Sequence, residues 1–316
     1  MATKVARDAR KDAPTVARRF ATNAQPPERR VPLPGPDDDV RPRQGLPPSE
    51  ARYLQGDSLP VTSSVLISNS KYLNNPIFRE AYATQALRRH GPDLPPTYMV
   101  PVMARAFQEV IDYGRFAELI EQEKKRFPEF GEWLDARDDS SFRKEDLNGY
   151  LPGTLGRALS DFLNTPGMDM EFTSKGKTGS SDLEYLQRRR GYLHDLEHFV
   201  TGFGPNTAGE SALSIMDATQ DSRFFTPELA QMISAGNMWI TSTGIYRTSL
   251  HYHHTMPTYF EAVQQGIAAG LAVRQPLFMV RWANFLDWTL EDIASHLGFV
   301  RGPGEAWAWT TEATNG

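Results

Sequence analysis

Two histidines and three carboxylates lie within twenty residues, in the stretch GYLHDLEHFVTGFGPNTAGE. His194 and His198 are four residues apart, so on an α-helix their Cβ atoms lie about 5–6 Å apart on one face. Both imidazoles could therefore bind one metal ion. Asp195 is three residues before His198 and can reach the same ion or orient a ligating imidazole.

Glu197 and Glu210 are placed differently by the same geometry. At about 100° per residue, Glu197 points away from the histidine pair, and we expect it to be solvated. The first helix should end near Gly202, and Asn206 or Thr207 should cap the next helix, which carries Glu210 in or near its first turn. Helices joined by a short loop pack as neighbours, so Glu210 could return beside the histidines.

The chemistry that this set favours is metal binding without sulfur, because the chain has no cysteine. Imidazole and carboxylate donors accept Zn²⁺, Fe²⁺ or Mn²⁺. From the spacing alone, a solvated helix face remains an equal alternative. The zincin proteases are disfavoured because Asp195 stands where H-E-x-x-H has Glu. Histidine-aspartate phosphohydrolases are disfavoured because the upstream histidine, His90, is more than a hundred residues away.

The elements that must position these residues are helical by pattern. Ser181 is a plausible N-cap for the helix that carries the histidines. Strand patterns are scarce, with TYMVP (Thr97–Pro101) the best weak candidate. The sequence therefore predicts an all-α domain. The other helical patterns cover Arg79–Arg89, Pro101–Phe127, Leu155–Leu163, Pro227–Gly236, Tyr259–Val273 and Leu290–Leu297.

The composition separates a tail from a body. Residues 1–52 are rich in Pro, Arg and Asp and predict a flexible, disordered tail, whereas 53–316 predict one helical metal-binding domain. The basic start lacks an apolar region and so is not a secretory signal, and Asp8 and Asp12 weaken a mitochondrial transit peptide. A net charge of −5 argues against nucleic acid as a partner. The longest uncharged run, Leu229–Tyr246, is too polar to predict a transmembrane helix.

Three further features have a structural and a functional interpretation. The histidines of HYHH (His251, His253 and His254) predict a surface turn or a packed aromatic patch rather than a second site. The arginines at 188–190 could solvate a helix or serve the metal region. Small residues at Gly266, Ala269 and Gly270 favour close helix packing, with room for a lipid tail as the alternative hypothesis.

The run LQRRRGYLHDLEH (Leu186–His198), followed by eleven residues and Glu210, resembles the HDxxH(x)11E signature of the coenzyme Q biosynthesis protein four family, which serves ubiquinone assembly. Gly209 with Glu210 keeps the family's Gly-Glu pair. LPGTLGRALSDFL (Leu151–Leu163) is similar to the family's LP-x-G-S/T-L-G-R segment.

The C-terminal stretch WANFLDWTLEDIASHLG (Trp282–Gly298) resembles the family's W…PLEE-x-R-x-x-LG ending, with Thr289 in place of the common proline. Gly191 stands where family members often have Arg. The segment after Glu210 is longer and more polar than usual. These departures leave the metal donors in place and bear on the substrate.

The resemblance implies an all-α domain of the family's type with a divalent metal on His194, Asp195, His198 and Glu210. Zinc is favoured, and iron or manganese are alternatives. Arg189 matches a family arginine and is the expected catalytic residue, because an arginine beside a metal can hold a carboxylate.

The implied function lies in ubiquinone biosynthesis. It is a metal-dependent decarboxylase (lyase) activity, an oxidative decarboxylation and hydroxylation at the first ring carbon of a polyprenylated hydroxybenzoate. An enzyme is favoured over two alternatives: a non-catalytic lipid-binding scaffold for a quinone-biosynthesis complex, and a metal enzyme of another pathway on the same scaffold.

The resemblance also implies partners and a location. We expect a polyprenylated aromatic lipid, other quinone-biosynthesis proteins and further copies of the chain, as a homo-oligomer, to bind. We expect a cytoplasmic place or peripheral contact with the inner membrane, and disfavour the mitochondrial matrix side.

Overall fold

The computed structural model describes residues 70–89, 99–137, 141–171 and 179–315. Within these ranges the chain forms α-helices and short 3₁₀ segments without any strand, so the predicted all-α class is confirmed. An isolated antiparallel bridge joins Thr154 and Thr289. The α-helices are α4 Lys71–Asn74, α5 Pro76–Leu87, α6 Met99–Gln108, α7 Tyr113–Arg126, α8 Pro128–Ala136, α9 Leu155–Asn164, α10 Asp182–Thr201, α11 Thr207–Phe224, α12 Pro227–His251, α13 Met256–Ala272, α14 Leu290–Leu297 and α15 Trp309–Asn315.

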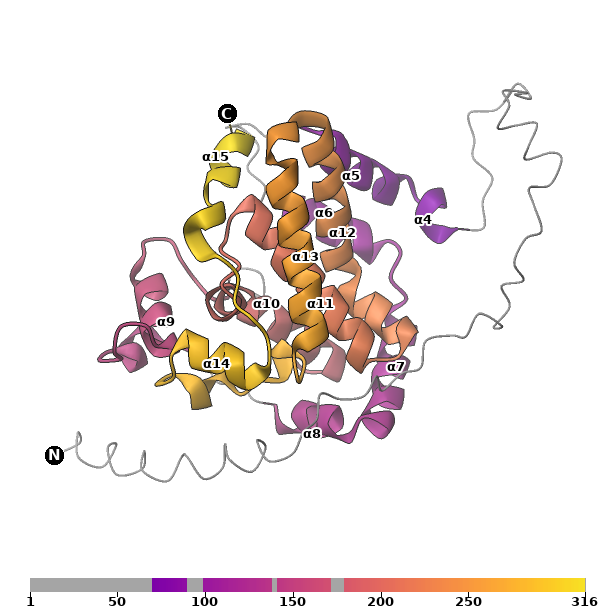
Figure 1. The fold of residues 1–316 in the computed structure, drawn as a ribbon. Coiled ribbons are helices and arrows are strands. Elements are labelled where there is room, and N and C mark those ends of the chain that lie inside the picture. The colour runs from indigo at the N-terminus through magenta and orange to yellow at the C-terminus, as the bar shows by residue number, and fades with distance from the viewer. Residues whose placement is uncertain (1–69, 90–98, 138–140, 172–178, 316) are drawn as a thin grey trace, which may run out of the picture.

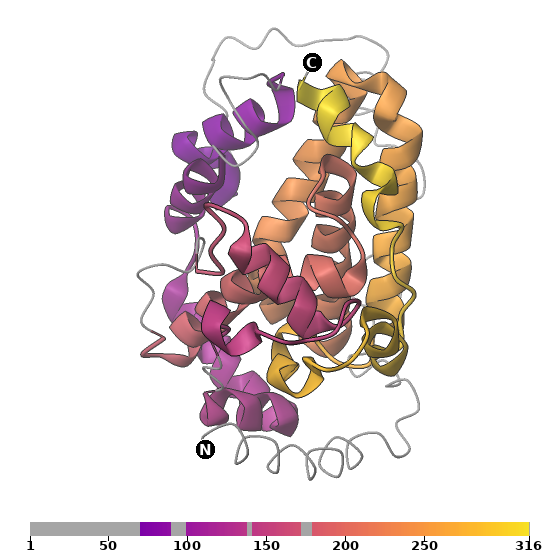
Figure 2. The same ribbon diagram turned by 90° about the vertical axis from the view of Figure 1, so that its left-hand side faces the viewer.

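Three long helices, α11, α12 and α13, form the centre of the molecule (Figure 1). α11 packs against both of the others, and the view turned by 90° shows α13 at the outer edge (Figure 2). α10, which precedes α11, also packs against α7, α9 and α14. This arrangement gives α11 neighbours on several sides, so polar residues on it lie near the core.

The small residues of α13 let its backbone approach α11. A Cβ added at Gly266 would lie 2.2 Å from the carbonyl oxygen of Ala212, and one at Gly270 would lie 2.6 Å from that of Met216. Such distances exclude any larger side chain without movement of a backbone. Close packing against α11 is therefore the role of Gly266 and Gly270, while binding of a lipid tail stays a prediction.

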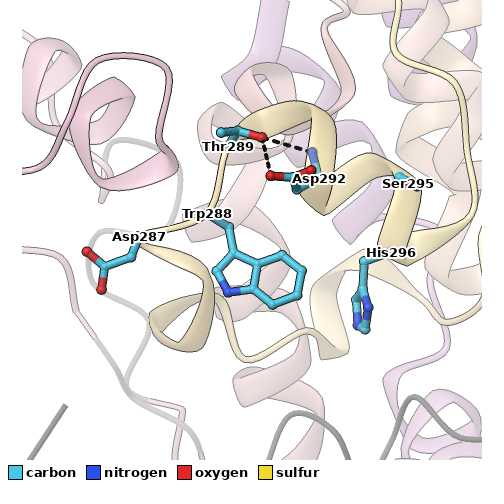
Figure 3. Close-up of a pocket in the computed structure, with 6 residues that line it drawn as sticks. All are labelled: Asp287, Trp288, Thr289, Asp292, Ser295 and His296. Atoms are coloured by element: carbon cyan, nitrogen blue, oxygen red, sulfur yellow. Dashed lines mark hydrogen bonds between the residues drawn. The ribbon is translucent and has the colours of Figure 1, made fainter. Parts of the chain in front are cut away.

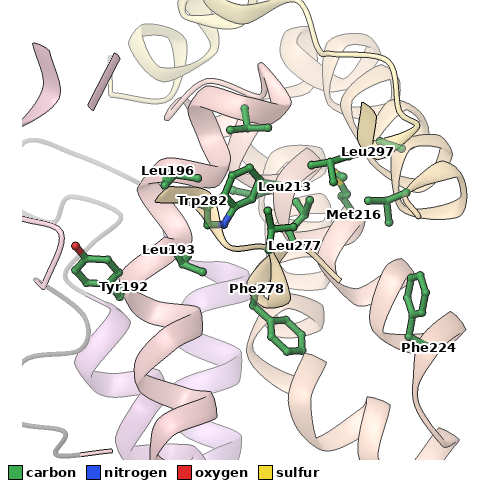
Figure 4. Close-up of a cluster of buried hydrophobic side chains, with 14 of the residues drawn as sticks. Tyr192, Leu193, Leu196, Leu213, Met216, Phe224, Leu277, Phe278, Trp282 and Leu297 are labelled. Atoms are coloured by element: carbon green, nitrogen blue, oxygen red, sulfur yellow. The ribbon is translucent and has the colours of Figure 1, made fainter. Parts of the chain in front are cut away.

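The hydrophobic core joins α10 to α11 (Figure 4). Leu193 and Leu196 of α10 and Leu213 and Met216 of α11 are fully buried in one cluster with Trp282. Burying one such aliphatic side chain stabilises a fold by about 1.5–3 kcal/mol. The cluster therefore fixes the two helices that carry the metal-ligating candidates.

The predicted helical stretch Pro101–Phe127 is divided in two. α6 ends at Gln108, and Asp112 caps α7 by accepting a hydrogen bond of 2.9 Å from the backbone N–H of Arg115. Aspartate is a preferred N-cap because its carboxylate satisfies an N–H that the helix leaves free. The apolar residues keep their helical spacing across the boundary between α6 and α7, so their pattern does not reveal the new helix that the Asp112 cap begins.

Two other boundaries differ from expectation. Met99–Pro101 belong to α6, so the weak strand prediction is wrong there, while Thr97 and Tyr98 lie outside the described residues. The helix predicted for Pro227–Gly236 continues to His251. In the extension Thr243 satisfies its hydroxyl on the helix itself by donating to the carbonyl oxygen of Trp239 at 2.8 Å.

The predicted tail, residues 1–52, and its boundary with the body lie outside the described residues. In the part of the chain that the structure describes, no helix is sufficiently long and apolar to span a bilayer. This agrees with the prediction made for Leu229–Tyr246.

Candidate metal centre

Three of the predicted metal donors converge between α10 and α11. One ligand atom each from His194, His198 and Glu210 lies within 4.8 Å of the other two. The two imidazole Nε2 atoms are 3.3 Å apart. The carboxylate of Glu210 lies 3.2 Å from Nε2 of His198 and 3.5 Å from Nε2 of His194. The chain therefore returns Glu210 beside the histidine pair, as the short loop predicted.

Local sequence explains why the two helices meet at this point. Ser181 caps α10 by accepting from the N–H of Glu184, and Gly202 ends it in the left-handed conformation, at φ 69°. Asn206 then caps α11 by accepting from the N–H of Gly209 at 2.9 Å. Each of these three predicted boundaries is confirmed. They leave a short reversal that brings the start of α11 back to the end of α10.

Gly209 makes this reversal possible. A Cβ at this position would lie 1.9 Å from the carbonyl oxygen of Gly204, too close for any side chain. The glycine that precedes Glu210 in the family-like Gly-Glu pair thus has a steric reason. It lets the first turn of α11 sit against the loop, which sets the depth of Glu210.

The tautomer of His198 is fixed by the loop. Its Nδ1 lies 2.5 Å from the carbonyl oxygen of Phe203. A carbonyl oxygen only accepts, so Nδ1 carries a proton, and Nε2 is the ring atom that faces His194 and Glu210 and can bind a metal. Such a hydrogen bond from the second ring nitrogen is the usual support of a metal-ligating histidine.

The spacing of the donors fits a metal ion. Tetrahedral coordination with bonds of about 2.0–2.1 Å places the donor atoms about 3.3–3.4 Å apart. The two Nε2 atoms are 3.3 Å apart, and each faces its own oxygen of Glu210, with Oε1 3.2 Å from His198 and Oε2 3.5 Å from His194. Two imidazoles and one carboxylate can therefore hold a divalent ion with little movement.

Charges and burial shift the pKa values of the side chains in and beside the donor group. Burial lowers the pKa of His194, but the hydrogen bond and charge of Glu210 outweigh burial and raise that pKa to about 9. Burial raises the pKa of Glu210, but His198 and His194 hold it well below its ordinary value. Burial also raises the pKa of Asp195, against the opposing charges of the two histidines. The cluster favours an ionised Glu210, as metal binding requires.

Asp195 and Arg189, the two other predicted site residues, are not among the three converging donors. Asp195 is close enough for its charge to act on both histidines but is not part of the donor group. The guanidinium of Arg189 lies over the ring of Tyr192, 5.3 Å from its centre, and the residue is buried. Direct ligation by Asp195 and substrate binding by Arg189 stay predictions.

The expectation that Glu197 is solvated is wrong. Its side chain is only 4% exposed. Burial raises its pKa well above the ordinary value, and the charge of Asp217 adds to that rise. Helical geometry placed Glu197 correctly off the metal face, but that side of α10 is also covered by protein.

A buried ion-pair cluster, Arg190 with Asp217 and Asp221, lies on the same two helices and was missed from the sequence. Arg190 donates to Asp221 at 3.3 Å through Nη1, and its Nη2 lies 3.1 Å from that carboxylate. Nη2 also lies 3.9 Å from the carboxylate of Asp217. The paired residues are 27 and 31 positions apart in the sequence, so no local sequence pattern predicts that they meet.

The HYHH histidines do not join the metal donors. α12 ends at His251, whose ring nitrogen Nε2 lies 2.7 Å from the carbonyl oxygen of Leu87. His253 and His254 are exposed and contact each other's rings at 5.8 Å, while Tyr252 between the histidines is buried. The prediction of a surface turn with aromatic packing is confirmed.

A surface pocket of about 520 Å³ opens at the start of α14, and none of the three metal donors lines it (Figure 3). The side chains of Trp288 and His296 lie on one side of the helix, and Thr289 caps it while hydrogen-bonding Asp292. Two of the six lining residues, Thr289 and Asp292, form the cap of α14 and no metal donor lines the pocket, so the donor cluster remains the candidate site. The pocket is lined by Asp287, Trp288, Thr289, Asp292, Ser295 and His296.

The three metal donors lie within a stretch of the chain that matches a known protein family. A family model described as Coenzyme Q (ubiquinone) biosynthesis protein Coq4 matches residues 137–303, more than half of the chain. The fold is similar to a crystal structure of a candidate ubiquinone biosynthesis protein from Nostoc punctiforme PCC 73102, with a TM-score of 0.54 and 21% identity. That match covers 74% of this chain and 99% of the other. No curated protein matches the chain.

Proposed function

The chain belongs to the Coenzyme Q (ubiquinone) biosynthesis protein Coq4 family, and we propose that it acts in that pathway as a metal-dependent enzyme on a polyprenylated hydroxybenzoate. The proposed reaction replaces the carboxylate on the first ring carbon with a hydroxyl. The bond between the ring and the carboxyl carbon breaks and carbon dioxide leaves. One oxygen atom of dioxygen enters the ring, and the other leaves as water with two protons and two electrons from an external reductant.

The observation that carries the proposal is the set of three protein donors. Structural zinc sites are usually closed by four protein ligands, whereas catalytic sites use three and leave a position for water or substrate. His194, His198 and Glu210 form the group of three, in the His₂Glu composition of known catalytic sites. When bound, a divalent ion would supply a positive charge that binds the ring carboxylate and stabilises developing negative charge.

The residues around the ion have distinct proposed roles. Phe203 fixes His198 through its carbonyl oxygen, and Glu210 balances part of the positive charge. Asp195 is proposed as an orienting group for an imidazole, and the alternative is that it is a further ligand, which would fill the open position. Arg189 is proposed to hold the substrate carboxylate, a role that the conservative Arg189→Lys variant tests, because lysine keeps the charge but loses the bidentate geometry. Zinc is favoured, with iron and manganese as alternatives.

The test uses the full chain loaded separately with Zn²⁺, Fe²⁺ or Mn²⁺. Each form is given a prenylated hydroxybenzoate labelled in its carboxyl carbon, dioxygen and a reductant, and released carbon dioxide is counted. We expect release with at least one metal, and loss of release in a folded Glu210→Ala variant. A His253→Ala variant is the matched control, because His253 is exposed and outside the donor group.

Carbon dioxide release by Glu210→Ala equal to that of the parent protein would show that the reaction does not need the donor group, and would remove the metal-centred proposal. No release from the parent protein with any of the three metals would favour the non-catalytic scaffold, in which the ion braces α10 and α11 and the protein presents a polyprenylated lipid to other quinone-biosynthesis proteins.

A further inference from the structure

Arg190 occupies an unusual position relative to the metal donors. It lies on α10 one helical turn before His194 and two turns before His198. Its acidic partners, Asp217 and Asp221, lie two to three turns after Glu210 on α11. The order of the partners is reversed between the helices, so α10 and α11 run antiparallel. The two helices are therefore linked by polar groups at two levels, with the metal donors near the loop and Arg190 further from it.

The acidic partners of Arg190 are themselves held in place by neighbouring side chains. Ser234 of α12 donates to Asp221 at 3.0 Å, and Asn237 of α12 donates to Asp217 at 3.3 Å. Gln220 donates to the other oxygen of Asp217 at 2.6 Å and accepts the backbone N–H of residue 277 at 3.0 Å. Neither carboxylate can follow Arg190 freely if α10 moves.

The guanidinium is also held on its apolar side. It lies over the ring of Phe278, 5.0 Å from the ring centre. Asp221 is fully buried, and the side chain of Arg190 is 17% exposed. Burial lowers the pKa of Arg190, but the charges of Asp221 and Asp217 outweigh burial and raise it. A translation or rotation of α10 would leave buried charges without their partners, which is strongly unfavourable.

We propose that Arg190 is a positioning residue for the metal centre, whose contacts with Asp221 and Asp217 fix α10 against α11 in the register that brings His194, His198 and Glu210 together. The proposal rests on the metal site of the proposed function but not on its reaction. Residues around a metal that orient its ligands typically alter affinity by about 10- to 100-fold when changed. An effect at the lower end is expected here, because Arg190 acts through the helices and not through a direct contact.

The experiment compares full-length variants without substrate. Arg190→Met removes the charge and keeps much of the side-chain volume, Arg190→Lys keeps the charge, and Asp221→Asn removes the main partner. Arg115→Met is the matched control, because Arg115 also joins two helices through an ion pair, with Glu228 at 2.7 Å, but neither helix carries a metal donor. The readouts are zinc affinity by chelator competition, the visible spectrum of bound Co²⁺, and hydrogen exchange along α10 and α11.

We expect Arg190→Met to weaken zinc binding about tenfold and to change the Co²⁺ spectrum, with Arg190→Lys recovering part of both. Hydrogen exchange should increase locally around residues 194–198 and 207–214. Arg115→Met should match the parent protein in all three measurements. If Arg190→Met does not fold, the same losses are expected from Asp221→Asn.

Unchanged zinc affinity and an unchanged Co²⁺ spectrum in folded Arg190→Met, or in Asp221→Asn if only that variant folds, would overturn the proposal. Arg190 would then stabilise the fold without setting the site. If the parent protein binds no zinc or Co²⁺, the metal premise of the proposed function fails. Hydrogen exchange then decides the register role alone, supported by a local increase and overturned by its absence.

Discussion

Nδ1 of His198 lies 2.5 Å from the carbonyl oxygen of Phe203, to which it donates a hydrogen bond. Phe203 is the first residue after the glycine that ends α10. The end of a helix thus sets the tautomer of a histidine one turn earlier, and directs Nε2 towards Glu210. Metal binding at this site depends on the loop as well as on the donors.

The first prediction concerns metal content. We expect the purified chain to hold one divalent ion per molecule and His198→Ala to lose it, because His198 is the donor with the fixed lone pair. Elemental analysis measures both. His253→Ala should keep the ion, and equal metal in the His198→Ala and parent proteins would disprove the assignment.

The second prediction concerns pH. The pKa of His194 is raised to about 9 without metal, so near neutral pH the ring is protonated and must lose its proton to bind an ion. Apparent affinity should rise about tenfold per pH unit up to about pH 9, and binding near pH 7.5 should release about one proton. Calorimetry in buffers of different ionisation enthalpy measures this release.

The raised pKa of His194 affects the stability of the metal-free protein in the opposite direction: metal affinity rises with pH, whereas this contribution to stability falls. A base whose pKa is raised on folding stabilises the fold below its unfolded pKa, and this contribution is lost as pH rises towards 9.

The control for proton release is Glu210→Gln, which removes the main charge that raises the pKa of His194. This variant should release fewer protons on any residual metal binding. No proton release from the parent protein would contradict the prediction.

The third prediction concerns Gly209. Gly209→Ala should destabilise the fold by about 1–3 kcal/mol, because the new methyl group would overlap the carbonyl of Gly204. It should also weaken metal binding, since relief of the overlap displaces Glu210. Denaturant unfolding measures the first effect and chelator competition the second.

Gly236→Ala provides the control for that substitution. Gly236 lies inside α12, and the atom nearest to a Cβ added there would be the terminal methyl carbon of Met103, at 3.9 Å. Alanine there should be neutral or stabilise by up to about 1 kcal/mol through helix propensity. Equal costs at the two positions would show that the turn tolerates a side chain.

The fourth prediction concerns Asp195. Asp195→Asn should lower zinc affinity about tenfold while keeping full occupancy at saturating zinc, as expected of a group that supports ligands without being indispensable. Titration with zinc measures both quantities. Complete loss of binding, as in His198→Ala, would instead make Asp195 an essential ligand.

Much of the local architecture around the site follows from nearest neighbours in the sequence. Ser181, Gly202 and Asn206 mark helix ends because their caps use atoms three or four residues away, and the structure confirms all three. The His194–His198 pairing and the return of Glu210 follow from helical repeat and a short loop. Interactions of this kind, between residues close to one another in the chain, can be predicted from the sequence alone.

Tertiary packing decided what the sequence could not. Glu197 faces away from the metal donors as its angle requires, yet it is buried because other helices cover that side of α10. Arg190 meets Asp221 only because α10 and α11 run antiparallel, and α11 in turn is held by α12 and α13. Helical periodicity gives the direction in which a side chain points. Whether solvent, an opposite charge or a backbone lies in that direction depends on contacts between segments distant in the chain.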